Sequence, residues 1–130
     1  MDCLVDAHAL LWHRAGDRRL PRRVRAILGG DGDDLHVSDA TFWELSIKHS
    51  LGRLELEGGV ESLHEEWIGQ GVAAALPVRW AHILRVGQLP QLHGDPFDRM
   101  LVAQALVENL VVLTGDPHIA GYPGVQVLWD

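Results

Sequence analysis

Short apolar runs alternate with longer helix-forming stretches along almost the whole chain, and this alternation limits the possible folds more than any other feature. Runs of strand character cover residues 3–6, 35–38, 72–78, 110–116 and 125–129. Helical patterns cover residues 7–14, 21–28, 39–51, 60–69, 79–86 and 95–108. Strands that alternate with helices favour a parallel sheet covered on both faces. The sequence therefore predicts a three-layer α/β/α sandwich with a central parallel sheet of about five strands.

Length and composition suit one domain. With 130 residues, 47% of them hydrophobic, the chain can bury one substantial core, so we expect a single domain over residues 1–130. The single cysteine, Cys3, cannot form a disulfide within the chain, and the first residues lack the pattern of a signal peptide. No apolar run approaches the roughly 20 residues of a membrane-spanning helix. We therefore expect a cytoplasmic protein with no membrane segment.

Local signals indicate where several helices begin and end. Pro21 occupies a favoured first-turn position, and Gly52 is placed to end the preceding helix in a left-handed cap. The run GGDGDD, residues 29–34, has the composition of a calcium-binding loop but lacks its terminal glutamate. It is interpreted as a turn.

Two of the expected strands are followed by an aspartate. Asp6 comes directly after the first strand, and Asp116 closes the run VVLTGD. The carboxyl ends of parallel strands meet at one edge of a sheet, and ligands bind there near the point where strand order reverses. Aspartate is also a common helix cap or turn residue after a strand. Each aspartate is therefore a candidate ligand with a structural alternative.

Two further aspartates flank a Pro-Phe pair in DPFDRMLVAQALVE, residues 95–108. With Pro96 at the first helical position, Asp95 can cap the helix and Asp98 can complete a capping box. The same geometry turns Asp98 toward the positive end of the helix dipole, where a carboxylate stays ionised and can bind a cation. The stretch alone does not decide between these interpretations.

Glu44 lies too deep in its helix to be a cap, and most of its helical neighbours are apolar. A carboxylate in such surroundings needs a partner, which is either Lys48 at i+4 or a bound metal ion. Four converging carboxylates would repel one another unless a cation neutralised them. A site built only from carboxylate oxygens suits Mg²⁺ or Mn²⁺.

Four blocks of the sequence, in this order, resemble those of a known family: LVDAHALLW, VSDATFWELSIKHSLGRL, HGDPFDRMLVAQALVENLVVLTGDP and VQVLW. Together they cover nearly the whole length. The chain resembles a PIN-domain ribonuclease, specifically a VapC-type toxin of a bacterial type II toxin–antitoxin pair. The resemblance implies that the acidic metal ligands and catalytic residues are Asp6, Glu44, Asp98 and Asp116.

The resemblance also separates the two aspartates of DPFD. Asp98 matches the family position because the alanine expected five residues later is Ala103, which leaves Asp95 as the cap with a possible accessory role. Ser38 and Thr114 resemble hydroxyl residues that flank the acidic site. The chain departs from the pattern at Ala7, where many relatives carry Thr or Ser, and this puts catalytic efficiency in doubt.

The activity implied by the resemblance is Mg²⁺-dependent hydrolysis of single-stranded or loop RNA, with Mn²⁺ as a substitute, to leave a 5′-phosphate and a 3′-hydroxyl. The implied partners are the RNA, a cognate antitoxin and a second copy of the chain in a homodimer. A net charge of −7 weighs against generic nucleic-acid binding. The basic residues cluster, however, and Arg14, Arg22 and Arg99 are candidate phosphate contacts.

Two alternatives belong to other functional classes. A catalytically inert PIN-like module would bind only a partner protein. A phospho-receiver domain is also a small α/β sandwich with aspartates at its sheet edge, although its usual lysine follows a late strand and Lys48 lies early. A zinc site and a serine or cysteine hydrolase are disfavoured, because the histidine spacing matches no zinc motif and no G-x-S-x-G occurs.

Overall fold

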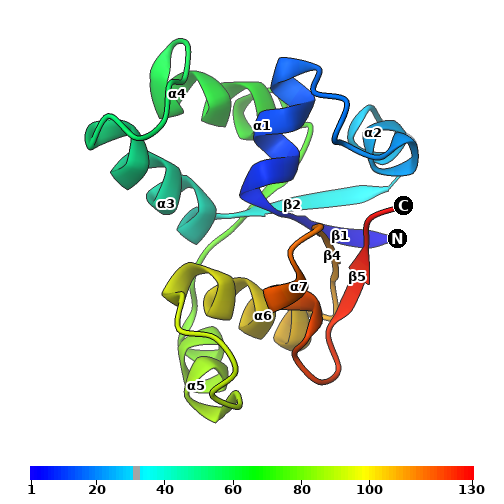
Figure 1. Cartoon of the computed structure of the whole chain (residues 1–130), viewed down its shortest axis with the longest axis vertical. Coiled ribbons are helices and arrows are strands. Elements are labelled where there is room, and N and C mark those ends of the chain that lie inside the picture. The colour runs from blue at the N-terminus through cyan, green and yellow to red at the C-terminus, as the bar shows by residue number, and fades with distance from the viewer. Residues whose placement is uncertain (31–32) are drawn as a thin grey trace.

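A five-stranded sheet lies between two layers of helices (Figure 1) in the computed structural model, which describes residues 1–30 and 33–130. The first half comprises β1 (Asp2–Val5), α1 (Ala7–Ala15), α2 (Arg22–Leu28), β2 (Asp34–Ser38), α3 (Asp39–Ser50), α4 (Gly59–His64) and the π-helix η1 (Glu65–Gly69). The second half comprises β3 (Ala74–Leu76), α5 (Trp80–Gln88), α6 (Pro96–Glu108), β4 (Val111–Leu113), α7 (Pro117–Ala120) and β5 (Gln126–Leu128). The expected α/β sandwich with five strands is confirmed.

The strands are all parallel and run in the order β3-β2-β1-β4-β5. From β1 the chain first builds toward one edge through β2 and β3, and then builds toward the other edge through β4 and β5. The order therefore reverses between β1 and β4, which is where parallel α/β sheets open a crevice for ligands. A receiver domain has the order 2-1-3-4-5, so this topology contradicts the receiver alternative.

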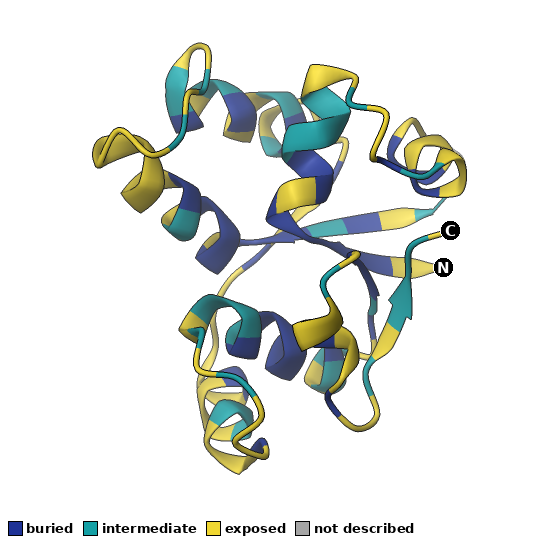
Figure 2. Ribbon diagram, viewed as in Figure 1, coloured by how far each residue is buried: buried dark blue, intermediate teal, exposed yellow. Residues whose placement is uncertain are grey.

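The core has two halves, one on each face of the sheet (Figure 2). Side chains alternate along β1, so that Cys3 and Val5 pack under α1–α4 while Leu4 packs under α6 and α7. All three are fully buried. The central strand is thus covered on both faces, and its carboxyl end holds Asp6 in a rigid frame.

The structure differs locally from the expected elements. Pro21 is the residue before α2 rather than a member of its first turn, and the stretch 60–69 divides into α4 and η1. Helix α3 ends at Ser50, and Gly52 adopts the left-handed conformation expected of it, with φ of 72°. The short α7 was not expected from the sequence. The turn expected over 29–34 includes residues 31–32, which lie outside the described residues.

No helix in the described part of the chain is both long enough and apolar enough to cross a membrane bilayer.

Candidate metal centre

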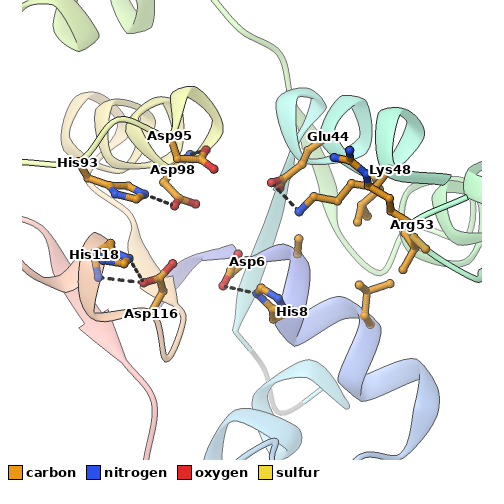
Figure 3. Close-up of a pocket in the computed structure, with 14 residues that line it drawn as sticks. Asp6, His8, Glu44, Lys48, Arg53, His93, Asp95, Asp98, Asp116 and His118 are labelled. Atoms are coloured by element: carbon orange, nitrogen blue, oxygen red, sulfur yellow. Dashed lines mark hydrogen bonds and ion pairs between the residues drawn. The ribbon is translucent and has the colours of Figure 1, made fainter. Parts of the chain in front are cut away.

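The four predicted acidic residues line one pocket of about 500 Å³ beside the carboxyl ends of β1 and β4 (Figure 3). They come from four different parts of the fold. Asp6 joins β1 to α1, Glu44 lies on α3, Asp98 lies in the first turn of α6 and Asp116 precedes α7. The structure therefore brings together side chains that are up to 110 positions apart in the sequence, at the place where the strand order reverses.

Asp6 is held between β1 and β4. Its side chain is buried, its Oδ2 accepts a hydrogen bond of 2.7 Å from the Thr114 hydroxyl, and its backbone N–H donates to the Leu113 carbonyl. Asp6 precedes α1, but its side chain makes no capping hydrogen bond. Helix capping therefore does not account for this carboxylate. The predicted neighbour Thr114 lies beside the acidic site and also accepts from the backbone N–H of Asp116.

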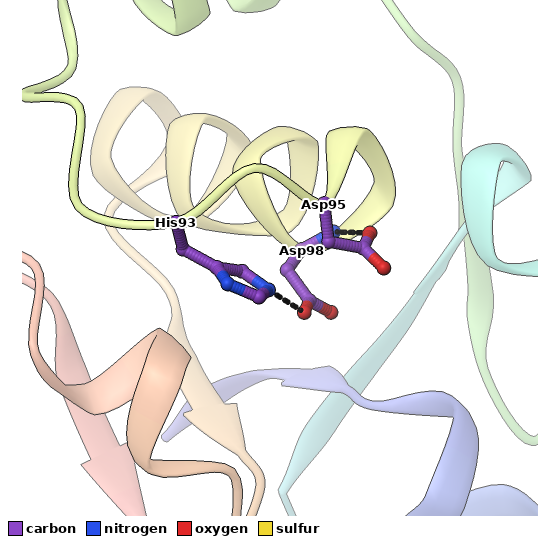
Figure 4. A group of neighbouring side chains, drawn as sticks. All are labelled: His93, Asp95 and Asp98. Atoms are coloured by element: carbon purple, nitrogen blue, oxygen red, sulfur yellow. Dashed lines mark hydrogen bonds and ion pairs between the residues drawn. The ribbon is translucent and has the colours of Figure 1, made fainter.

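Asp95 and Asp98 have separate environments at the start of α6 (Figure 4). Asp95 is the cap, because its Oδ1 accepts from the backbone N–H groups of Phe97 and Asp98 at 2.8 and 3.0 Å. Asp98 does not return this interaction as a capping-box residue would. Its Oδ2 instead lies 3.0 Å from Nε2 of His93.

Burial, together with the negative charge of Asp95, raises the pKa of Asp98 to about 6. The hydrogen bond from His93 acts in the opposite direction, and the charges of Asp116 and Asp6 add smaller upward contributions. The ionised form of Asp98 is thus disfavoured first by burial and then by neighbouring carboxylates. A divalent cation among these groups would relieve that repulsion.

Asp116 and Glu44 each retain a structural interaction that the sequence left open. Asp116 caps α7, since its Oδ1 accepts from the His118 backbone N–H at 2.9 Å. Glu44 pairs with Lys48 at 3.1 Å, which is the i+4 partner considered as the alternative to a metal. The limited exposure of Glu44 therefore does not by itself require a cation. Both carboxylates nevertheless line the pocket with Asp6 and Asp98.

Three histidines accompany the acids, and sequence reasoning missed them. His8 lies 3.9 Å from Asp6, His93 bonds to Asp98, and the His118 ring lies 3.3 Å from Asp116. The rings of His93 and His118 stack, with centroids 4.2 Å apart and planes at 2°. The nearby Asp6 carboxylate raises the pKa of His8. The available signal was an Asp-x-His pattern at two strand ends, which zinc motifs do not contain.

The donors fit a hard divalent cation. Carboxylate oxygens of Asp6, Asp98 and Asp116 face a common space, with Glu44 on the adjoining wall. His93, Asp95 and Asp98 also place one donor atom each within 4.8 Å of one another. Oxygen-rich sites of this kind suit Mg²⁺ and Mn²⁺. The histidines add neighbours that can orient the carboxylates.

Ser38 and Arg99 both make contacts within the protein. The Ser38 hydroxyl is fully buried and accepts from the Ala40 backbone N–H, so it caps α3 and does not line the pocket. Arg99 is also buried, and its guanidinium donates to the carbonyls of Val86 and Pro90 and to the Tyr122 hydroxyl. With its donors directed inward, Arg99 is not available to bind a phosphate.

The other two arginines considered as phosphate contacts, Arg14 and Arg22, lie outside the pocket. Arg14 donates from its Nη2 to the Glu57 carbonyl before α4 and to the Glu66 carboxylate on η1, so this side chain is engaged within the protein. Arg22 is exposed on α2 and does not line the acidic cavity. Contact of these two residues with phosphate stays a prediction, and it would be made away from the acidic pocket.

A family model describing the PIN domain matches residues 3–125. The chain therefore belongs to the PIN domain family. The structure is similar to that of VapBC2 from Rickettsia felis bound to a DNA fragment from its promoter, with 13% sequence identity, a TM-score of 0.75 and full coverage of both chains. It is also similar to DNA-bound VapBC from Salmonella typhimurium, with 18% identity, a TM-score of 0.69 and coverage of 98% and 97%.

VapBC-1 from nontypeable Haemophilus influenzae shares 17% identity over 98% of this chain and 97% of the other, with a TM-score of 0.68. A comparison with curated proteins by sequence finds no match. At these identities the solved structures establish the fold of the chain.

Proposed function

We propose that the protein is a Mg²⁺-dependent endoribonuclease, the VapC-type toxin of a toxin–antitoxin pair, acting on single-stranded or loop RNA in the cytoplasm. The observation that carries this proposal is the convergence of Asp6, Glu44, Asp98 and Asp116 on one pocket at the reversal of strand order. Membership of the PIN family supports it, as does similarity to structures of VapBC complexes.

In the pocket, the four carboxylates would bind the metal ion, and neighbouring side chains orient two of these carboxylates. Mg²⁺, or Mn²⁺ in its place, would be held by the four acidic side chains and would lower the pKa of a bound water for attack on a phosphodiester. Thr114 fixes the rotamer of Asp6 through its 2.7 Å hydrogen bond, and His93 fixes that of Asp98. Thr114 directly follows β4 and His93 lies in the loop before α6, so the two carboxylates are held in place before a ligand binds.

The antitoxin partner is proposed to insert an apolar helical segment into a surface hollow. A cavity of about 460 Å³ lies away from the acidic pocket and is lined in part by Leu28, Trp67 and Val72. Helices bind such grooves through their apolar faces. Trp67 is largely buried in the core, so only the exposed edge of this hollow is free to contact a partner.

A homodimer is proposed to form through α5. This helix exposes Trp80, Ile83 and Leu84, with 72%, 48% and 50% of their surfaces accessible. Apolar side chains gathered on one helix favour association, and a second copy would cover the same face in a two-fold arrangement.

The deciding experiment compares wild type with Asp98→Asn on a pool of total RNA with Mg²⁺. We expect wild type to cleave RNA, cleavage to stop in EDTA, and Asp98→Asn to lose at least most of the activity. Asp95→Asn is the matched control, because asparagine caps a helix about as well as aspartate. Equal cleavage by wild type and Asp98→Asn would point to a contaminating nuclease and end the proposal.

Titration of Mn²⁺ by calorimetry tests the inert-module alternative. A nuclease should bind Mn²⁺ at a site that Asp6→Asn abolishes. An inert PIN-like module should show no site that depends on Asp6.

A further inference from the structure

One wall of the acidic pocket is cationic. Lys48 and Arg53 line the same cavity as the carboxylates, on the side formed by α3 and the turn that follows it (Figure 3). Asp98 and Asp116 lie on the facing side. The α3 side of the pocket thus carries two cations next to Glu44, opposite Asp98 and Asp116, in a chain whose net charge is −7.

The end of α3 places the two cations together. Lys48 lies in the last turn of the helix, and Gly52 then takes a positive φ of 72°, which reverses the chain. The backbone N–H of Arg53 donates to the Lys48 carbonyl at 2.9 Å as part of this cap. A left-handed residue after a helix normally closes the last turn in this way, so the spacing of Lys48 and Arg53 follows from local structure.

Arg53 differs from the other arginines considered for RNA binding. Arg14 and Arg99 use their guanidinium groups in contacts within the protein. Arg53 is exposed, and across residues 1–30 and 33–130 its guanidinium makes no hydrogen bond or ion pair. Lys48 has Glu44 as its partner but remains 47% exposed, so its ammonium can also reach a ligand in the cavity.

A polyanion must approach this site against the charge of the whole molecule. Phosphates draw their binding energy from lysine and arginine, and arginine adds paired donors that match two phosphate oxygens. We propose that Lys48 and Arg53 bind the RNA backbone phosphates next to the scissile bond, and that they hold the strand across the carboxylates. This inference rests on the proposed function, and it moves RNA contact from the arginines of the N-terminal segment to the end of α3.

The test measures how salt weakens RNA binding. A short fluorescein-labelled single-stranded RNA of mixed sequence is titrated with wild type, Lys48→Gln, Arg53→Gln and the double variant, over a series of KCl concentrations. Ca²⁺ replaces Mg²⁺ to slow hydrolysis. Fluorescence anisotropy gives the slope of the logarithm of affinity against the logarithm of salt concentration. Each lost phosphate contact should flatten that slope by about 0.7 for a single strand.

Two controls separate a phosphate contact from a general loss of charge or of the metal site. Arg85→Gln removes one positive charge on α5, outside the pocket, and should leave the slope unchanged. Mn²⁺ titration by calorimetry should show that both pocket variants bind the ion at least as tightly as wild type, since neither residue offers it a ligand. The salt slope of Arg22→Gln shows whether α2, in the arginine-rich N-terminal part of the chain, also contacts the RNA.

The outcomes distinguish this inference from the proposed function. Flatter slopes for Lys48→Gln and Arg53→Gln support phosphate binding by these two residues, even if wild type with Mg²⁺ cleaves no RNA. Wild-type slopes in both variants overturn it, even if wild type is an active nuclease. A slope flattened by Arg22→Gln alone assigns RNA binding to the N-terminal segment, and absence of RNA binding by wild type overturns both ideas.

Discussion

Two aspartates three positions apart at the start of α6 differ in what surrounds their oxygens. Asp95 accepts two backbone N–H donors and faces the helix terminus, which favours its role as a cap. Among the described residues, the side chain of Asp98 has the His93 ring as its one hydrogen-bond partner, and several carboxylates lie nearby. The Asp95 carboxylate therefore stabilises the start of α6, whereas the charged form of Asp98 is disfavoured by burial and by the neighbouring charges.

The raised pKa of Asp98 predicts that, without divalent metal, the protein loses stability as pH rises from about 4 to about 6. In this window the folded protein holds a proton on Asp98 that the unfolded chain, with an ordinary aspartate pKa of 3.8, has already released. The penalty is complete above pH 6 and amounts to about 3 kcal/mol. Urea unfolding in EDTA across this range measures it.

Asp98→Asn should remove this decline and be more stable than wild type at pH 7. Glu65→Gln, an exposed change on η1, should keep the wild-type pH dependence. Identical pH profiles for wild type and Asp98→Asn would show that the carboxylates do not repel one another as inferred.

Removal of the α6 cap gives the second prediction at this scale. Asp95→Ala should lower the free energy of unfolding by about 1 kcal/mol, while Asp95→Asn should change it little. Asp95→Asn should also lower the pKa of Asp98, because it removes a neighbouring negative charge. Chemical denaturation measures the first effect, and the pH profile of stability measures the second. A large loss of stability in Asp95→Asn would contradict the capping role.

At the scale of elements, α5 and α6 are joined by a buried polar cluster. His82 is fully buried, its Nδ1 accepts from the Arg79 backbone N–H, and its Nε2 therefore donates to Glu108 at 2.8 Å. Gln104 lies next to this ring. The cluster holds α5 against the helix that carries Asp98, so the outer helix layer contributes to the stability of the site's scaffold.

Loss of the imidazole should separate these helices. His82→Leu leaves the Arg79 N–H and the Glu108 carboxylate without their partner, at a cost of about 3 kcal/mol. Glu108→Gln keeps an acceptor for the ring and should cost about 1 kcal/mol. Thermal unfolding followed by circular dichroism compares the two variants. If both lost the same stability, the hydrogen bond to the ring would not be what joins α5 to α6.

At the scale of the whole molecule, burial is uneven. The inner strands β1, β2 and β4 and the inner faces of α1 and α6 are largely buried, whereas α5 is largely exposed and apolar (Figure 2). Its exposed face lies outside the acidic pocket and outside the hollow proposed for the antitoxin. The proposed self-association therefore leaves both sites open.

Charges on α5 should weaken the proposed dimer without affecting the metal centre. Trp80→Glu combined with Ile83→Glu should shift the mass in sedimentation velocity from dimer to monomer, because each charge would be buried without a partner in the interface. Leu51→Glu, an exposed apolar position after α3, is the control and should keep the wild-type mass. An unchanged mass in the double variant would place any dimer contact elsewhere.

Much of the fold could be predicted because it follows from local patterns. Three examples depend only on neighbours within a few positions. They are the alternating side-chain directions along β1, the helix cap at Asp95 and the left-handed conformation of Gly52. The short α7 escaped prediction because four residues carry too little periodicity, and its start depends on the Asp116 cap.

The sequence by itself determined which elements form and which carboxylates lie at strand and helix ends, because propensity, capping and side-chain period are local properties. Only the tertiary structure decided which of those groups meet. In the folded protein Arg99 points inward and Ser38 caps α3. Lys48 and Arg53 line the same pocket as the four acidic residues. The physical reason is that burial and charge interactions depend on distances through space, which sheet order and helix packing set.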